Sequence, residues 1–286
     1  MPAASKKSVI AQSKTTAEKV AANPWMQRLA RFGYAAKGVV YIVIGALATL
    51  AALGYGGGET TDTRGALQTI ETQPFGKAVL FIVAVGLVGY ALWRLIQAVA
   101  DTEDKGSKLK GIAVRIGYAC SGLAYAGLSL TAARTLIEAG EPDSSSRVQE
   151  RWTERLMALP YGAWLVELAG ACVVGFGLYQ IYKGWRAKFR KRLKLGEMGK
   201  AKDNWATWSG RFGYGARGIV FILVGAFLIQ AARHYNPAET KGLDQVLSGL
   251  ARQAYGPWLL GGVAAGLISY GFYMLVEARY RRINGS

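Results

Sequence analysis

The sequence predicts an all-α membrane protein, with six transmembrane helices arranged as three repeated helical hairpins in approximate threefold pseudo-symmetry. Three observations predict this fold. Apolar runs of about 20 residues recur along the chain, one short helical motif is written three times, and 37 of the 286 residues are glycine. Apolar runs of that length favour lipid, and abundant glycine is typical of closely packed membrane helices.

The first repeated motif begins at Arg31, Arg115 and Arg211, where an Arg, an apolar residue, a Gly and a Tyr follow one another. Within it, a Tyr, a small residue near the next turn, an aromatic and another small residue form one stripe along an α-helix. A neighbouring helix can approach closely on that stripe. The residues assigned to helix packing are Tyr34, Gly38 and Gly45, then Tyr118, Gly122 and Ser129, then Tyr214, Gly218 and Gly225.

A second repeated motif opens at Phe75-Gly76, Tyr161-Gly162 and Tyr255-Gly256. Each pair begins an apolar run that carries small residues, two aromatics and one polar residue on a single helical face. The polar residues at matched positions are Gln97, Lys183 and Glu277. The repeat unit is therefore a two-helix hairpin, and the chain holds three of them.

The motifs and the loops between them divide the chain into segments. We expect a mobile basic tail, three hairpins, a polybasic loop and a second basic tail. Their boundaries are 1–30 for the first tail, 31–100 for hairpin 1, 101–183 for hairpin 2 with the short loop before it, 184–210 for the polybasic loop, 211–278 for hairpin 3 and 279–286 for the last tail.

Individual elements follow from local signals. Residues 23–31 predict a short interfacial helix, because Asn-Pro-Trp is typical of a helix start at the headgroup level. The first span then covers 34–53, with Lys37 one turn inside and able to snorkel to the surface. The third span, 116–133, is the least hydrophobic. The outer loops carry short helices that lie on the surface.

The distribution of charge predicts the orientation. The formal net charge is +17, and most of the 35 Lys and Arg residues fall in the N-terminal tail, in the loops after the second and fourth spans, and at the C-terminus. Positive charge is retained on the cytoplasmic side of a membrane. We therefore expect a multi-pass protein of the bacterial inner (plasma) membrane with both termini cytoplasmic.

The polybasic loop predicts contact with anionic membrane lipids. Trp185, Phe189 and Leu193 recur every four residues, so one face can enter the interface while the cations meet phosphates. Nucleic acid is not an expected partner, because no recognition module accompanies the charge. The candidate headgroup ligands are Arg186, Lys188, Arg190, Lys191, Arg192 and Lys194.

Residues for catalysis, cofactors or metals are sparse. The sequence has one histidine, His234, and two cysteines, Cys120 and Cys172, which we interpret as small core residues kept reduced. A plausible set of nucleophile, base and acid is missing. We therefore expect no enzymatic activity, no cofactor and no bound metal.

Glu167 is the one carboxylate placed within an apolar run, so it is the candidate for a transport-related role. It lies near the start of its span, where water is reachable. The function favoured is a structural, lipid-binding or partner-binding role, with a membrane protein as a possible partner. The alternative is a small channel or transporter for an ion or small solute, because repeats place equivalent helices around an axis.

The triple Arg-Phe/Ile-Gly-Tyr hairpin repeat resembles the bacterial membrane family catalogued as domain of unknown function 1206, over residues 31–279. The resemblance implies three copies of a two-helix domain in a membrane, and it implies no catalytic residue because the family has no established activity. The middle copy departs from the pattern, with Ile116 in place of Phe and Ser121 in place of the basic Lys37 and Arg217. This departure suggests that the basic side chain is not needed in every unit.

Overall fold

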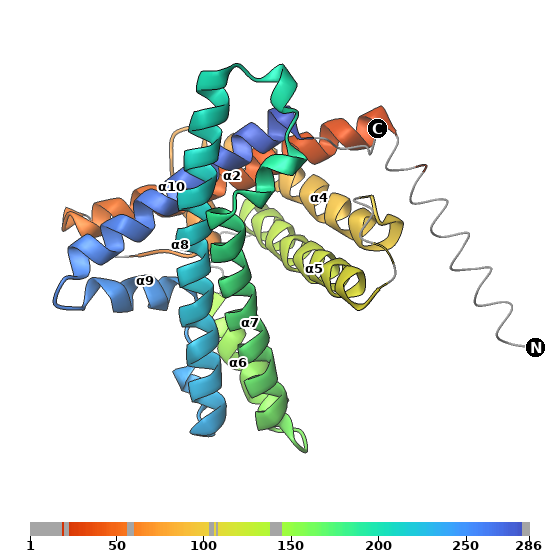
Figure 1. The fold of residues 1–286 in the computed structure, drawn as a ribbon. Coiled ribbons are helices and arrows are strands. Elements are labelled where there is room, and N and C mark those ends of the chain that lie inside the picture. Colours follow the sequence, from red (N-terminus) through yellow and green to blue (C-terminus); the bar gives the residue numbers. More distant parts are fainter. Residues whose placement is uncertain are drawn as a thin grey trace, which may run out of the picture.

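The computed structural model describes residues 19, 23–55, 60–102, 106, 108–137 and 145–281. The expected tails therefore lie largely outside the described residues. Within them the chain is helical, and an isolated antiparallel bridge joins Leu193 to Arg281. The helices are drawn in Figure 1.

In the described residues the molecule has six long helices, with three short helices and three 3-10 turns between them. The long helices are α2 (Pro24–Ala52), α4 (Gly76–Ala100), α5 (Leu109–Ile137), α7 (Gly162–Trp185), α8 (Lys200–Arg233) and α10 (Gly256–Tyr280). The short ones are α3 (Thr63–Glu71), α6 (Ser145–Met157) and α9 (Leu243–Ala251), with η2 (Lys188–Arg192), η3 (Leu195–Glu197) and η4 (Pro237–Glu239). Five of the long helices are long and apolar enough to cross a membrane, so this is a multi-pass membrane protein. The sixth, α5, has 29 residues but is less apolar.

Two boundaries differ from the sequence-based expectation. The interfacial helix expected over residues 23–31 is continuous with the first span, because α2 starts at Pro24, with the Asn23 side chain accepting a hydrogen bond of 2.9 Å from Trp25 N. Nothing between Pro24 and Ala52 breaks the helix. The polybasic loop is also shorter than 184–210, because α8 already begins at Lys200.

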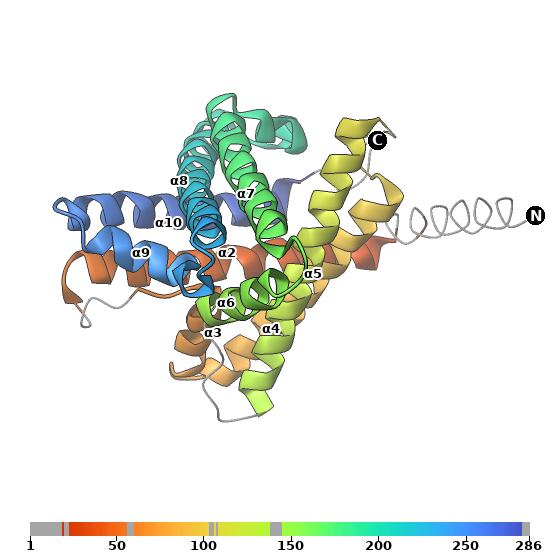
Figure 2. The ribbon, with the colours of Figure 1, turned by 90° about the horizontal axis from the view of Figure 1, so that it is seen from below.

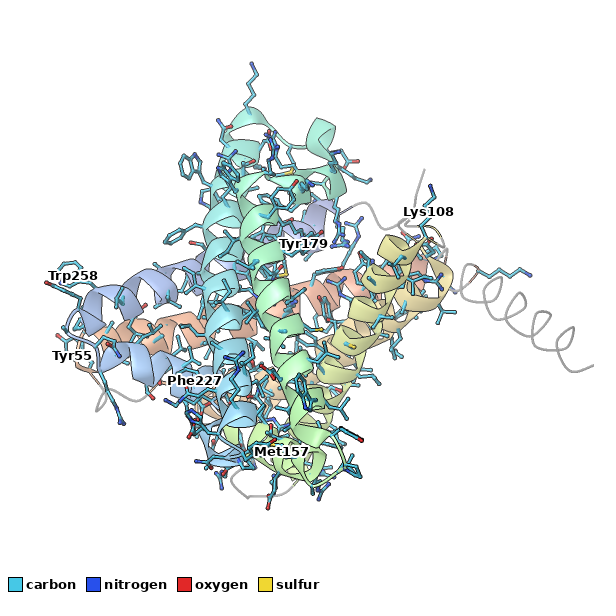
Figure 3. The ribbon with its side chains drawn as sticks, turned by 60° about the horizontal axis from the view of Figure 1, so that its bottom comes forward. Tyr55, Lys108, Met157, Tyr179, Phe227 and Trp258 are labelled. Atoms are coloured by element: carbon cyan, nitrogen blue, oxygen red, sulfur yellow. The ribbon has the colours of Figure 1, made fainter. Side chains whose placement is uncertain are left out.

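The most extensive helix contacts join different repeats. The second helix of each repeat packs against the first helix of the next, as α4 with α5 and α7 with α8, and α10 closes the ring on α2. Figure 1 shows that these three pairs run in different directions. In Figure 3, Tyr55 just beyond α2 lies beside Trp258 near the start of α10, as expected for an antiparallel pair.

Glycines of the first motif allow this close pairing. A methyl carbon added at Gly38 would lie 2.8 Å from the carbonyl oxygen of Gly271, and one at Gly218 would lie 2.7 Å from that of Gly177. Such distances are shorter than van der Waals contact, so the helix backbones touch at these points. The same approach recurs at Gly45, Gly122 and Gly225, where the facing carbonyls belong to Ala264, Ala91 and Gly170.

Within repeats, the first and third hairpins pack alike and the middle one does not. Helix α2 packs on α4, and α8 packs on α10, with Gly86 against the Ala36 methyl and Gly266 against that of Ala216. The matched residues of the middle repeat are Cys120 and Cys172, and both are exposed. No extensive contact joins α5 to α7 among the described residues.

The middle hairpin is therefore open. Gly33 and Gly213 lie against the backbones of Tyr90 and Tyr270, whereas the matched Gly117 has nothing within 4 Å of an added carbon. The expectation of three equal hairpins is thus not met by the middle repeat, and its cysteines are exposed rather than part of the core. Cysteines therefore stand at the two positions where the closed hairpins have an alanine facing a glycine.

The open hairpin makes a testable prediction about its two thiols. Because Cys120 and Cys172 are both free and exposed, we expect a membrane-permeant maleimide to add to both of them in the folded protein. Intact mass spectrometry would then show two adducts. A native disulfide, which needs Cβ atoms about 3.8 Å apart, would instead show that α5 and α7 pack together as their counterparts do.

The three short helices gather at one end of the bundle, which the view from below in Figure 2 brings forward. Helix α6 contacts α9, α3 contacts α5, and Thr60 donates a hydrogen bond of 2.9 Å to the carbonyl of Asp244 at the start of α9. The Asp62 side chain caps α3 by accepting 2.8 Å bonds from the amides of Arg64 and Gly65. We call this the short-helix end, and the opposite end, which carries η2 and η3, the loop end.

Candidate functional site

Basic side chains are buried between the long helices. Lys37 is 3% exposed, Lys183 8%, Arg217 8% and Arg281 1%. Lys37 does not snorkel as expected, because its ammonium group donates a 2.9 Å hydrogen bond to the Tyr90 hydroxyl inside the bundle. Buried charges need partners, so the surroundings of each one indicate what the core can bind.

One buried carboxylate, Glu277, faces the cations at the loop end. It accepts a 2.7 Å bond from Arg281 and a 3.2 Å bond from the Tyr273 hydroxyl. Lys183 on α7 donates a 2.7 Å bond to the Tyr214 hydroxyl on α8. Lys183 on α7 and Glu277 on α10 hold matched positions in the second and third repeats. Both repeats thus contribute to one polar layer at the loop end.

The first repeat completes this layer through Arg94. Its guanidinium donates bonds of 2.8 Å and 2.6 Å to the Tyr90 hydroxyl and one of 3.0 Å to the Gln97 side-chain oxygen. It also lies 5.1 Å from the ring centre of Tyr118 on α5. Sequence reasoning missed the role of these residues, although the repeated polar position at Gln97, Lys183 and Glu277 was the available signal.

The polybasic loop is anchored in the core rather than in the interface. Phe189 is fully buried, stacked 5.4 Å from the ring of Tyr214 and edge-on to Tyr273, and Leu193 is 2% exposed. The backbone amide of Lys194 donates a 2.8 Å bond to the carbonyl of Tyr280. The expectation that Phe189 and Leu193 enter the interface is wrong, because the helix ends at Trp185 and the loop folds back.

Five of the six candidate headgroup ligands have partners within the protein, and two of them, Arg186 and Lys188, interact with Tyr182. Arg190 pairs with Asp203, Arg192 donates a 3.0 Å bond to the Tyr118 hydroxyl, and Lys194 pairs with Glu197 at 2.9 Å. The bond from Lys194 holds the pKa of the Glu197 carboxyl below its ordinary value. The candidates that stay exposed at the loop end are Arg186, Lys188 and Lys191.

Glu167 is placed at the surface near the short-helix end. It forms a 2.9 Å ion pair with Arg233, whose side chain is 69% exposed. It does not line the cavity that lies beneath the short helices.

The helix-packing tyrosines lie inside the bundle, where Tyr34 contacts Tyr90 edge-on with ring centres 5.1 Å apart.

That cavity has a volume of about 400 Å³. It is bounded by α2, α5, α8 and α10 and covered by α3, α6 and α9. Arg217, Tyr41 and Tyr125 line it from the long helices. In the part of the chain that the structure describes, no group of three or more His, Cys, Asp or Glu side chains is placed to hold a metal ion.

Comparison with known proteins places these features in a family. The chain is 36% identical over 260 residues to the uncharacterized protein YxxB of Bacillus subtilis (strain 168), covering 91% of this chain and 93% of that protein. No solved structure matches. The family model described as Domain of Unknown Function (DUF1206) matches three times, at residues 32–101, 116–187 and 212–281. The chain therefore belongs to this family, with one copy of the domain in each hairpin repeat.

Proposed function

We propose that the protein is a non-enzymatic lipid-binding protein of the bacterial plasma membrane, which holds anionic headgroups at its loop end. All six long helices span the membrane, the three helix pairs are arranged with approximate threefold symmetry although the middle hairpin is open, and both termini are cytoplasmic. The ring of pairs supports this arrangement. Each pair joins the first helix of one repeat to the second helix of another, as α5 with α4, α2 with α10 and α8 with α7. Helix α5 is therefore equivalent to α2 and α8. The loop end is then the cytoplasmic end.

The observation that carries the proposal is the excess of positive charge at the loop end. The cations Arg281, Lys183, Arg192 and Arg94 all act on the carboxylate of Glu277, and Arg281 bonds to it directly. A single carboxylate does not neutralise them, so an anion bound nearby is favoured by the field of the cluster. Arg186, Lys188 and Lys191 are exposed at the same end, each worth about 1 kcal/mol beside an anionic membrane surface.

A channel is less well supported by the packing. Between the cavity and the loop end lie Tyr34, Tyr90 and Tyr273, each fully buried, so side chains fill the interior there.

Binding of a membrane protein partner is a second candidate role. The span of α7 is the least buried of the five candidate spans, at 22%, which leaves a broad face for a neighbouring membrane helix.

Neutralising the exposed cations tests the proposal. The triple variant Arg186→Gln, Lys188→Gln, Lys191→Gln leaves the bonded Arg190 and Arg192 intact, so the loop keeps its fold. We expect reduced retention of phosphatidylglycerol and cardiolipin in native mass spectrometry, because three headgroup contacts are lost.

The matched control removes the same charge from the short-helix end, at exposed positions of α6. It carries Arg147→Gln, Arg151→Gln and Arg155→Gln. We expect it to retain these lipids like the wild type. Equal lipid retention by both triple variants would contradict binding at the loop end.

A further inference from the structure

An arginine with one unsatisfied buried donor lines the cavity beneath the short helices. Arg217 is 8% exposed, and its Nε atom is buried without a partner. The guanidinium carbon lies 4.2 Å from the ring centre of Tyr270, 5.1 Å from that of Tyr41 and 5.3 Å from that of Phe221. Aromatic faces attract a cation, but they do not replace the acceptors that a buried guanidinium loses with water.

The surroundings of Arg217 leave its charge uncompensated. None of the described residues that line the cavity is acidic, a second arginine, Arg64, also lines it, and the Lys37 ammonium nitrogen lies 5.9 Å from the centre of the Tyr41 ring. A buried cation left in this way favours an anionic ligand. At the short-helix side of the cavity, the Gln149 side-chain oxygen is also buried without a donor.

Apart from these side chains and the polar Thr63 and Arg64, the lining is apolar. Its walls are formed by Ala124, Leu128, Val148, Val220, Phe221, Val224, Leu243 and Leu267. A volume of about 400 Å³ is large enough for a small organic molecule and too small for a two-chain phospholipid. The cavity therefore fits an anion that carries one apolar body.

We propose that this cavity binds an amphipathic monocarboxylate, such as a medium-chain fatty acid, with its carboxylate on Arg217. The planar guanidinium matches a carboxylate through two parallel hydrogen bonds. A single negative charge matches the guanidinium of Arg217, whose buried Nε has no acceptor. The aliphatic chain lies against the valine and leucine walls. This site is distinct from the headgroup contacts at the loop end.

The open middle repeat gives such a ligand a route from the bilayer. Ala124 on α5 lines the cavity and is exposed, whereas the matched Val40 of the first repeat is 1% exposed. Phe176 on α7, 46% exposed, stands at the other side of the gap with its ring 5.1 Å from that of Phe221. An aliphatic chain therefore enters between α5 and α7 without crossing water.

Binding of decanoate to the full-length protein in nanodiscs tests this assignment. We expect decanoate to raise the melting temperature, while decanol, with the same chain and no charge, and inorganic phosphate do not. Arg217→Met should weaken decanoate binding at least tenfold. The same variant should melt at or above the wild-type temperature without ligand, because it removes a buried cation whose Nε has no acceptor.

Two further variants keep the test decisive. Arg217→Lys retains the charge but loses the planar pair of donors, so it should bind decanoate more weakly than the wild type and still fold. Arg233→Met removes an exposed arginine and should bind decanoate normally. Equal stabilisation by decanol, or undiminished decanoate binding by both Arg217 variants, would overturn the proposal and leave lipid retention at the loop end unaffected.

Discussion

Replacing Gly218 with Leu is expected to lower the free energy of unfolding by about 3 kcal/mol or more, because overpacking here involves backbone on both sides. A single added carbon would lie 2.7 Å from the carbonyl oxygen of Gly177 and 2.5 Å from Ile181 Cγ1. Neither helix can make room without separating α7 from α8 along their length. Thermal unfolding in detergent, followed by circular dichroism, measures the loss.

The control for this prediction lies one turn earlier on the same helix. Gly215 has nothing within 4 Å of an added carbon, so Gly215→Leu changes the same residue type in the same helix without a collision. We expect its melting temperature to stay close to that of the wild type. If both variants melt alike, contact between the helix backbones does not limit stability, and the interpretation of the glycine stripe is wrong.

Replacing Glu277 with Leu is expected to lower the free energy of unfolding by about 3–5 kcal/mol, the range for breaking a buried ion pair. The side chains of Glu277 and Arg281 are each 2% exposed and 2.7 Å apart. Without the carboxylate, Arg281 and the neighbouring Lys183 stay buried with no compensating charge. Denaturant or thermal unfolding of the variant in detergent measures the difference.

Two comparisons separate charge compensation from simple packing. The double variant Glu277→Leu, Arg281→Met removes both charges and should recover much of the lost stability. Glu167→Gln breaks a pair whose arginine is 69% exposed, and it should change stability by less than about 1 kcal/mol. A double variant no more stable than Glu277→Leu alone would contradict the role assigned to Glu277.

The helices and their packing faces follow from the sequence, but their partners do not. The spacing of Gly38 and Gly218 indicates a face on which another helix packs, and the structure places Gly271 and Gly177 opposite them. A period of 3.6 residues identifies a face and carries no information about which helix covers it. The main pairs join neighbouring repeats, which a division of the chain into hairpins does not predict.

Residues at matched positions of the three repeats indicate that the middle hairpin differs from the other two. Positions held by Ala36 and Gly86 in the first repeat are held by Cys120 and Cys172 in the second. The size of the side chains at this one contact differs, although the periodicity does not. Periodicity alone therefore predicts three equal hairpins.

The burial of Lys37 and Phe189 could not be predicted from the sequence. Lys37 lies one turn inside its span, where a lysine usually extends to the interface. Its burial depends on Tyr90 of the same repeat and on Tyr125 of the next, whose ring centre is 4.8 Å from the ammonium nitrogen. Likewise, Phe189 is buried because the loop folds back toward Tyr273, which local spacing does not reveal.

We propose that the bundle holds anionic amphiphiles and does not conduct ions. Chloride efflux from proteoliposomes tests it most directly, because a positively charged interior would pass anions most readily if it passed any ion. The filled layer at Tyr34, Tyr90 and Tyr273 predicts efflux equal to that of protein-free liposomes. Protein-dependent chloride efflux that disappears in Arg217→Met would contradict the account and identify a transport pathway through the cavity.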